Sequence, residues 1–316
     1  MTNDASRTGG VLAVKGVVVT ERDVNLLCDL LCYGAMLPVH LQALFFPECS
    51  RRRMNQRLRQ LCDAGLVLRR PMPLGLGGAL PHADASWSVP LVYRLGGAGA
   101  PLVAARLGWD IADVRRLVRA GTPTAIAHTL AVVSLRVRAE RAVQERNAAG
   151  AEGQLQLAFL PERLVRHGYQ VRAPGGRWRE EVYKPDALLR FRFGASAETL
   201  FAVEADLGHT SSSEWKRKME IAVRYRRSGL FQKRYGATGF LTLVCTTGGR
   251  RLANLRRLFE ASLKPEDAAA FGVATLADIA ARGPLDADWH VPGWATPLAL
   301  EAWANMRGGL GGGINT

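Results

Sequence analysis

Long apolar runs and paired cysteines are both missing from this 316-residue chain. No stretch of about 18 uninterrupted apolar residues is present, and the first ten residues lack the charged and then apolar layout of a signal peptide. We therefore expect no membrane-spanning helix and predict a cytoplasmic location. The cysteines are odd in number and form no C-x-x-C pair, which predicts reduced core thiols. Cys28 and Cys32 lie one helical turn apart, but no second ligand pair accompanies them and His40 to form a metal site.

Acidic residues are also scarce relative to basic ones. The chain has 28 Asp and Glu against 42 Lys and Arg, which gives a formal net charge of +14 and a sequence pI of about 10.2. Such a surplus predicts a polyanionic partner, and its arginine content favours phosphate groups and guanine edges over a membrane surface. The length predicts two domains.

The first part of the chain has helix signals at short intervals. Thr20, with Asp23 three residues later, is typical of a helix N-cap, and this helix is expected to end near Gly34. A second helix is expected from Pro38 to about residue 45, and Ser50 is the expected cap of a third. Apolar runs at 66–68 and 89–93 then predict two strands joined by a long loop. Together these elements predict a winged helix-turn-helix domain over residues 11–112, after a disordered segment at 1–10.

The third helix carries the side chains that we expect to contact DNA. Residues 51–70 contain seven arginines against one aspartate, Asp63. Arginine reads guanine edges, and asparagine or glutamine reads adenine. The predicted contact residues are Arg51, Arg52, Arg53, Asn55, Gln56 and Arg59. The alternative interpretation is a basic helix that only faces solvent.

The remainder of the chain alternates strand and helix signals. Strands are expected at 186–193, 199–206, 241–247 and 271–275, and helices from His128, after Thr210 and at 250–259. Residues 146–177 are expected to hold only one short helix, PERLVRHGY. This alternation predicts an α/β domain with a mixed sheet over residues 113–300, followed by a flexible Gly-rich tail at 301–316.

Acidic residues are placed where two of these strands would bring them together. Glu204 and Asp206 alternate onto one face of their strand, and Asp186 begins the neighbouring strand. Carboxylates grouped in this way are ligands for a hard divalent cation such as Mg²⁺. On the following helix Lys218 lies beside the apolar stripe and is better placed than Lys216 to reach these carboxylates. The alternative is that the acids are solvated strand ends or partners of arginine.

Several of these segments together resemble replication-relaxation family proteins of plasmids and other mobile elements. The resemblance covers roughly residues 20–260 and rests on the ordered succession of VPLVYRLGGAGAPLVAARLG, the His128 helix start, Lys184-Pro185-Asp186, VEADLGHT with Lys218, and VCTTGGRRLANL. It implies an N-terminal winged helix and a C-terminal domain similar to the PD-(D/E)xK nucleases, a restriction-endonuclease-like fold. It also implies that Asp186 and Glu204 bind metal and that Lys218 is a relocated catalytic lysine, with Glu181 as a candidate extra acid. Nucleases of this superfamily usually carry Glu-x-Lys, whereas this chain has Asp206 at the lysine position.

Two functions follow from this reading. The first is a duplex DNA-binding protein of a mobile element whose C-terminal domain nicks DNA as a Mg²⁺-dependent endonuclease. The second is a non-catalytic replication or transfer accessory factor, or a transcription regulator, with a degenerate nuclease fold. In both, double-stranded DNA is the expected partner, and a second copy of the chain or replication and transfer proteins are further expected partners.

Overall fold

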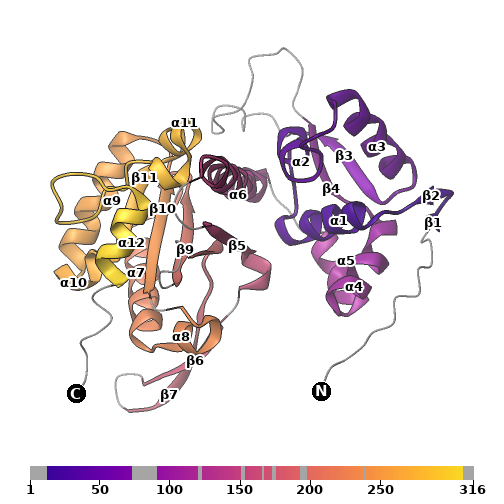
Figure 1. Ribbon diagram of the computed structural model, residues 1–316. Coiled ribbons are helices and arrows are strands. Elements are labelled where there is room, and N and C mark those ends of the chain that lie inside the picture. The colour runs from indigo at the N-terminus through magenta and orange to yellow at the C-terminus, as the bar shows by residue number, and fades with distance from the viewer. Residues whose placement is uncertain are drawn as a thin grey trace. The chain divides into compact units, whose positions relative to one another are not determined.

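The computed structural model describes residues 13–72, 91–119, 123–150, 154–165, 167–172, 176–192, 198–237 and 239–308. These residues form two compact units, of which unit 1 extends to Ile126 and unit 2 begins at Ala127 (Figure 1). Helix α5 (Ile111–Arg119) therefore lies in unit 1, although the sequence placed the domain boundary near residue 112. The segments predicted to be disordered at 1–10 and to form the loop between the first two long strands fall outside or largely outside the described residues.

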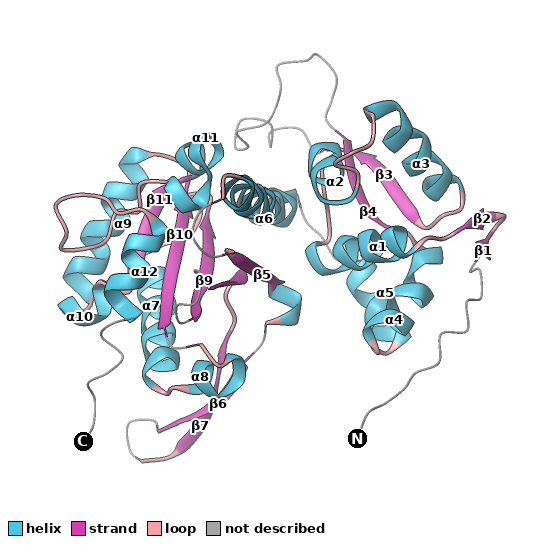
Figure 2. Cartoon of the chain, in the orientation of Figure 1, coloured by secondary structure: helices cyan, strands magenta, loops and turns pink. Residues whose placement is uncertain are grey.

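Unit 1 consists of helices and one main antiparallel strand pair, in the predicted order (Figure 2). Its helices are α1 (Glu21–Tyr33), α2 (Pro38–Phe45), α3 (Arg51–Asp63), α4 (Ala100–Leu107) and α5, and its strands are β1 (Ala13–Val14), β2 (Val17–Val18), β3 (Val67–Pro71) and β4 (Leu91–Leu95). β3 pairs with β4, and the short β1 pairs with β2.

Local signals account for the helix ends in unit 1. The Thr20 side chain accepts a hydrogen bond from the Asp23 backbone, and the Asp23 carboxylate accepts one from the Thr20 backbone at 2.8 Å. At the start of α3 the Ser50 side chain accepts a hydrogen bond from the backbone N–H of Arg53. Each such cap contributes about 1 kcal/mol. The predicted starts of these helices are confirmed.

Packing orients α3 so that its polar face is left outside. Met54, Leu58 and Leu61 are buried against the core of the unit, which follows their i, i+4, i+7 spacing. Arg57 lies beside this stripe, and its guanidinium is 2.5 Å from the fully buried carboxylate of Asp23 on α1. This ion pair fixes the rotation of α3 relative to α1.

Unit 2 is built on a five-stranded mixed sheet, as predicted. The strands are β5 (Gln156–Pro161), β8 (Ala187–Arg192), β9 (Glu198–Asp206), β10 (Gly239–Thr246) and β11 (Phe271–Thr275), in the order β11-β10-β9-β8-β5. β9, β10 and β11 are parallel, whereas β8 is antiparallel to β9 and β5 is antiparallel to β8. All eight residues of β10 are buried, which is typical of a strand covered on both faces.

Helices connect the parallel strands and cover the sheet (Figure 1). They are α6 (Pro123–Ala148), α7 (Ser212–Arg227), α8 (Leu230–Tyr235), α9 (Gly249–Ser262), α10 (Pro265–Ala268), α11 (Leu276–Asp286) and α12 (Leu300–Gly308). α7 and α8 form the crossover from β9 to β10, so α7 begins just after the carboxyl end of β9. α6 begins five residues earlier than His128, where the sequence placed its start. None of the described helices combines the length and the apolar character needed to cross a membrane.

The prediction for residues 146–177 is wrong. This region contributes β5 to the main sheet and β6 (His167–Arg172) to a separate antiparallel ribbon with β7 (Trp178–Tyr183). The predicted helix PERLVRHGY is a single 3-10 turn, Glu162–Leu164, followed by β6. The tyrosine of this segment packs inward from β6, because Tyr169 is buried while its neighbours Gly168 and Gln170 are exposed.

The predicted tail also proves to be folded over part of its length. α12 occupies residues 300–308, and residues 309–316 lie outside the described part. Trp303 of α12 is buried, its indole N–H donates to the backbone oxygen of Ala269, and its ring lies near Phe201 of β9. A Cβ at Gly272 of β11 would come within 2.6 Å of this ring, so the glycine makes room for it. The Gly-rich composition therefore misled the prediction for residues 301–308.

The cysteines are free thiols, as expected; Cys32 and Cys245 are buried and the other three are half-buried. Within the described ranges no cluster of three or more His, Cys, Asp or Glu side chains is arranged to hold a metal ion.

Candidate functional site

Four polar side chains from separate elements of unit 2 meet near the carboxyl end of β9, the central strand of the main sheet. His128 comes from α6, Asp186 precedes β8, Glu204 belongs to β9 and Lys218 to α7. We call these four residues the acid cluster. Asp186, Glu204 and Lys218 are the residues that the sequence predicted to lie together.

The backbone and side chain of Asp186 are both tied to β9. Its N–H donates to the backbone oxygen of Val203 at 3.0 Å, and its Oδ2 accepts from the N–H of Ala205 at 2.7 Å. Nε2 of His128 lies 2.9 Å from the same Oδ2. Burial alone would raise the pKa of Asp186, but the hydrogen bond and charge of His128, together with Lys218, lower it overall. Asp186 is therefore held as a carboxylate in a fixed orientation.

Glu204 is the other carboxylate of the acid cluster. Burial and the charge of Asp186 raise its pKa to about 7, although Lys218 acts in the opposite direction. Two carboxylates that oppose one another's ionisation in a buried setting favour the arrival of a cation.

Lys218 supplies a positive charge in this structure. Its Nζ is 2.5 Å from Oε2 of Glu204, and its side chain is 39% exposed. Burial alone would lower the pKa of Lys218, but the charges of Glu204 and Asp186 outweigh it and raise the pKa. The predicted proximity of Lys218 to Glu204 is thus present. The Lys218 ammonium also lies 5.5 Å from the ring centroid of the buried Trp215.

Asp206 has different partners from those that a metal ligand needs. Arg251 of α9 contacts both of its oxygens, at 2.6 and 3.2 Å, and Thr246 donates to Oδ2 at 3.2 Å. Arg251 also donates to the backbone oxygen of Thr210, and Asp206 is fully buried. Asp206 therefore joins the end of β9 to α9 and to the loop before α7. For Asp206 the alternative interpretation, in which the acid is a partner of arginine, therefore agrees with the structure.

Glu181, the candidate extra acid, lies on the β6–β7 ribbon rather than in the acid cluster. Arg224 of α7 binds it with two hydrogen bonds of 2.8 Å, and the hydroxyl of Tyr169 donates to it at 2.6 Å. These contacts lower the pKa of Glu181, with the hydrogen bond from Arg224 as the largest cause. The structure gives Glu181 the role of fastening the ribbon to α7.

The residues predicted to contact DNA lie on α3 of unit 1. All six, Arg51, Arg52, Arg53, Asn55, Gln56 and Arg59, are exposed on α3. They lie away from the buried stripe, so the predicted face is present and accessible.

A family model described as replication-relaxation matches residues 32–241. The chain belongs to the replication-relaxation family. No curated protein sequence matches it. The matched stretch contains every member of the acid cluster and the whole of α3, whereas Arg251 lies beyond it. Membership indicates a role in the replication or relaxation of plasmid or mobile-element DNA.

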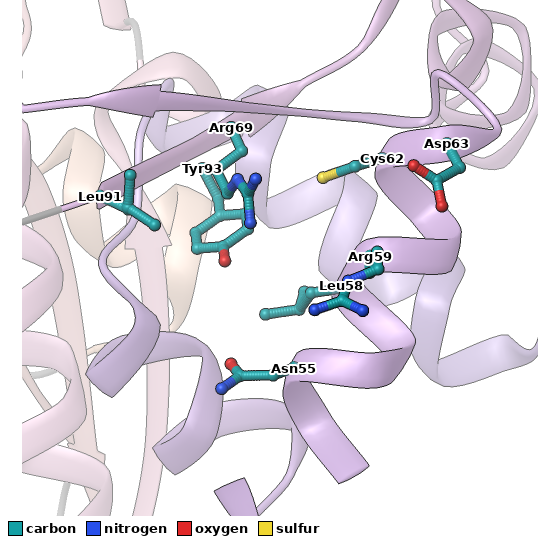
Figure 3. A pocket seen from close by; sticks show the side chains of 8 residues that line it. All are labelled: Asn55, Leu58, Arg59, Cys62, Asp63, Arg69, Leu91 and Tyr93. Carbon is teal, nitrogen blue, oxygen red and sulfur yellow. The ribbon is translucent and has the colours of Figure 1, made fainter. Parts of the chain in front are cut away.

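In this replication-relaxation protein a hollow of about 190 Å³ lies beside the exposed face of α3. It is lined by Asn55, Leu58, Arg59, Cys62, Asp63, Arg69, Leu91 and Tyr93 (Figure 3). Arg59 reaches it from α3, and Arg69 of β3 lies next to the ring of Tyr93 of β4 (Figure 3). Two guanidinium groups from different elements thus border one hollow.

Sequence reasoning missed His128 and Arg251 as site residues of the family member. The sequence indicates His128 only as the start of a helix and Arg251 only as one residue of the run VCTTGGRRLANL. A histidine near the beginning of a long apolar helix was the available signal for the first. Nothing in the local pattern paired Arg251 with Asp206, which is 45 positions away.

Proposed function

We propose that this replication-relaxation protein binds duplex DNA through α3 and nicks it with a divalent metal ion held at Asp186 and Glu204. The observation that carries the proposal is the buried carboxylate pair with Lys218 against Glu204 at 2.5 Å. Two acids that can hold a metal ion, with a lysine beside them, are groups that can assist phosphodiester hydrolysis.

The residues present fit a Mg²⁺ ion. Mg²⁺ keeps several waters and is usually held by one or two carboxylates together with substrate phosphate oxygens. Glu204 and Oδ1 of Asp186 would hold it, because the hydrogen bonds from His128 and Ala205 both reach Oδ2. When bound, the ion would supply an activated water and neutralise charge on the scissile phosphate.

The protein's own side chains then have separate tasks. His128 keeps Asp186 ionised and oriented, in the manner of outer-shell groups at metal sites. Lys218, which is partly exposed, would leave Glu204 for the phosphate and stabilise the charge that develops on it. Asp206 and Arg251 fix the end of β9, and thus the position of Glu204 two residues earlier.

The proposed DNA-binding surface is a winged helix. Its three helices and strand pair have the expected order, with α3 as the recognition helix. Arg59, Asn55 and Gln56 have the chemistry to read base edges, and the hollow bordered by Arg59 and Arg69 fits a backbone phosphate.

The test is relaxation of supercoiled plasmid by the purified full chain with Mg²⁺ or Mn²⁺. Asp186→Asn, Glu204→Gln and Lys218→Ala should each abolish nicking while duplex binding is retained. Glu140→Gln is a matched control, because this acid pairs with Arg136 at 2.7 Å on α6. Uncut plasmid with either cation, from a wild-type protein that binds DNA, would sink the nuclease proposal.

One observation favours the second function, a non-catalytic DNA-binding accessory factor or regulator. Asp206 occupies the position where the related nucleases carry lysine, and it is fully paired with Arg251. Under this function the plasmid assay gives no nicking, whereas substitutions on α3 still weaken DNA binding.

A further inference from the structure

Trp178 is the most exposed large hydrophobic side chain in the described residues, with 69% of its surface accessible. The side chains of Trp215, Trp289 and Trp303, by contrast, are at most 1% exposed. Trp178 begins β7, and its neighbours Arg177 and Arg179 are exposed. An exposed indole next to arginines presents a flat aromatic ring and positive charge at the same point of the surface.

The inner half of the β6–β7 ribbon is firmly anchored. Arg224 of α7 binds Glu181 through two hydrogen bonds, and the Tyr169 hydroxyl donates to the same carboxylate at 2.6 Å. The ring of Tyr183 stacks on that of Tyr225 with centroids 4.5 Å apart.

The β6–β7 ribbon extends outward from this packed inner half (Figure 1). Register pairs Trp178 with Arg172 at the outer end and Tyr183 with His167 at the inner end. Trp178 is thus five residues along β7 from Tyr183, whose ring packs on Tyr225 of α7. The exposed indole therefore lies at the outer end of a ribbon whose inner end is packed against α7.

We propose that Trp178, with Arg177 beside it, binds unpaired bases of DNA. A flat aromatic ring stacks on the face of any base, and neighbouring arginines neutralise phosphates. Bases inside a duplex are already stacked on each other, so the indole finds a free face only where the strands are separated. The proposal rests on the proposed function only in taking DNA as the partner.

Charge restricts the contact to the outer end of the ribbon. Glu180 is exposed and points to the same face of β7 as Trp178, two residues closer to the inner end of the ribbon. Arg179 faces the other way, and its Nη2 lies 3.2 Å from Glu181. Arg177 has no acidic partner in the described residues and is the stronger phosphate ligand of the two.

The ribbon also leads directly to the acid cluster. β7 ends at Tyr183, and Asp186 follows after Lys184 and Pro185. Trp178 is thus eight residues before Asp186 in the chain and belongs to the same unit. The proposal predicts that the protein prefers DNA that contains an unpaired region.

The experiment is fluorescence anisotropy with the full chain and two labelled duplexes, one fully paired and one with a short central bubble. Trp178→Ala should weaken binding to the bubble duplex about tenfold and leave the paired duplex unchanged, in line with the usual effect of removing one stacking ring. Trp178→Phe should retain part of the preference, and Arg177→Ala should reduce the salt dependence of bubble binding. Met306→Ala is the control, because this side chain is also exposed, at 41%, and lies on α12.

Bubble binding by Trp178→Ala equal to that of the wild type overturns the proposal, and so does an equal loss on both duplexes. A change in self-association without a change in DNA binding also overturns it and indicates a protein partner instead. The nuclease proposal fails or stands separately: Trp178-dependent bubble binding without nicking refutes only the nuclease. If the wild type nicks DNA but Trp178→Ala binds the bubble duplex as tightly as the wild type, only the present proposal is refuted.

Discussion

Nε2 of His128 and Oδ2 of Asp186 lie 2.9 Å apart, although the residues are separated by 58 positions in the chain. The contact joins α6 to the strand pair that carries both carboxylates. Burial opposes a positive charge on His128, yet the hydrogen bond and charge of Asp186 outweigh it and raise the pKa of the imidazole. This interaction leads to the first prediction.

His128→Gln should lower the nicking rate about 10–100-fold, because outer-shell partners of metal ligands have effects of this size. Duplex binding and the thermal midpoint should change little, since the His128 side chain is 33% exposed. Plasmid relaxation over time measures the rate, with Glu140→Gln on the same helix as the control. An unchanged rate would remove His128 from the site.

Arg251→Ala should destabilise the protein by about 3 kcal/mol or more, because it leaves the fully buried Asp206 without its cation. The control is Arg141→Ala, whose pair with Glu145 is 66% and 62% exposed and should contribute under about 0.5 kcal/mol. Urea unfolding of the full chain gives both values. Equal stabilities of the two variants would show that the Asp206–Arg251 pair does not hold β9 to α9.

Lowering the pH should reduce the free energy of unfolding because of His167. Burial is the largest cause that lowers its pKa to about 4, its Nε2 is 2.6 Å from the Tyr235 hydroxyl, and its buried Nδ1 has no partner in the described residues. Because the unfolded histidine takes a proton near pH 6.5 and the folded one only near pH 4, stability falls as the pH drops through this interval. The loss should approach about 3 kcal/mol.

His167→Gln should remove that part of the pH dependence. Thermal midpoints of wild type and variant measured between pH 7 and pH 4 give the comparison. Parallel curves across this range would mean that His167 is protonated as readily in the folded protein as in the unfolded chain.

On α3, Arg52→Ala or Arg59→Ala should weaken binding of the full chain to duplex DNA by about 1–3 kcal/mol if the side chain reads a base. The matched control is Arg106→Ala, since this arginine pairs with Glu21 on the surface of the same unit. Titrations at several salt concentrations separate base reading from phosphate contact, which would reduce the salt slope by about one. Unchanged affinity in both α3 variants would reject α3 as the recognition helix.

Local chemistry explains which elements could be predicted from the sequence. Thr20, Asp23 and Ser50 are signals that act within one helical turn, so the helix starts follow from them. The hairpin of β8 and β9 follows from two apolar runs, and the choice of Lys218 over Lys216 follows from the 3.6-residue period.

Distant partners explain what could not be predicted. The sequence WREEVY forms β7 because Tyr183 stacks on Tyr225 and Glu181 meets Arg224, both on a helix that begins about 30 residues later. The same holds for Asp206. Its position on a strand can be predicted from the sequence, but only the fold shows that Arg251 forms an ion pair with its carboxylate. Tertiary context decides such cases over local propensity.

The place of Trp303 against the main sheet has a consequence for synthesis of the protein on the ribosome. The indole fills the space left by Gly272 and lies near Phe201, so this part of the sheet gains its cover from α12. β9 and β11 are synthesised before α12, so this part of the sheet lacks its cover until α12 has been made. α1 to α5 belong to unit 1 and can fold before that point, while the chain is still growing.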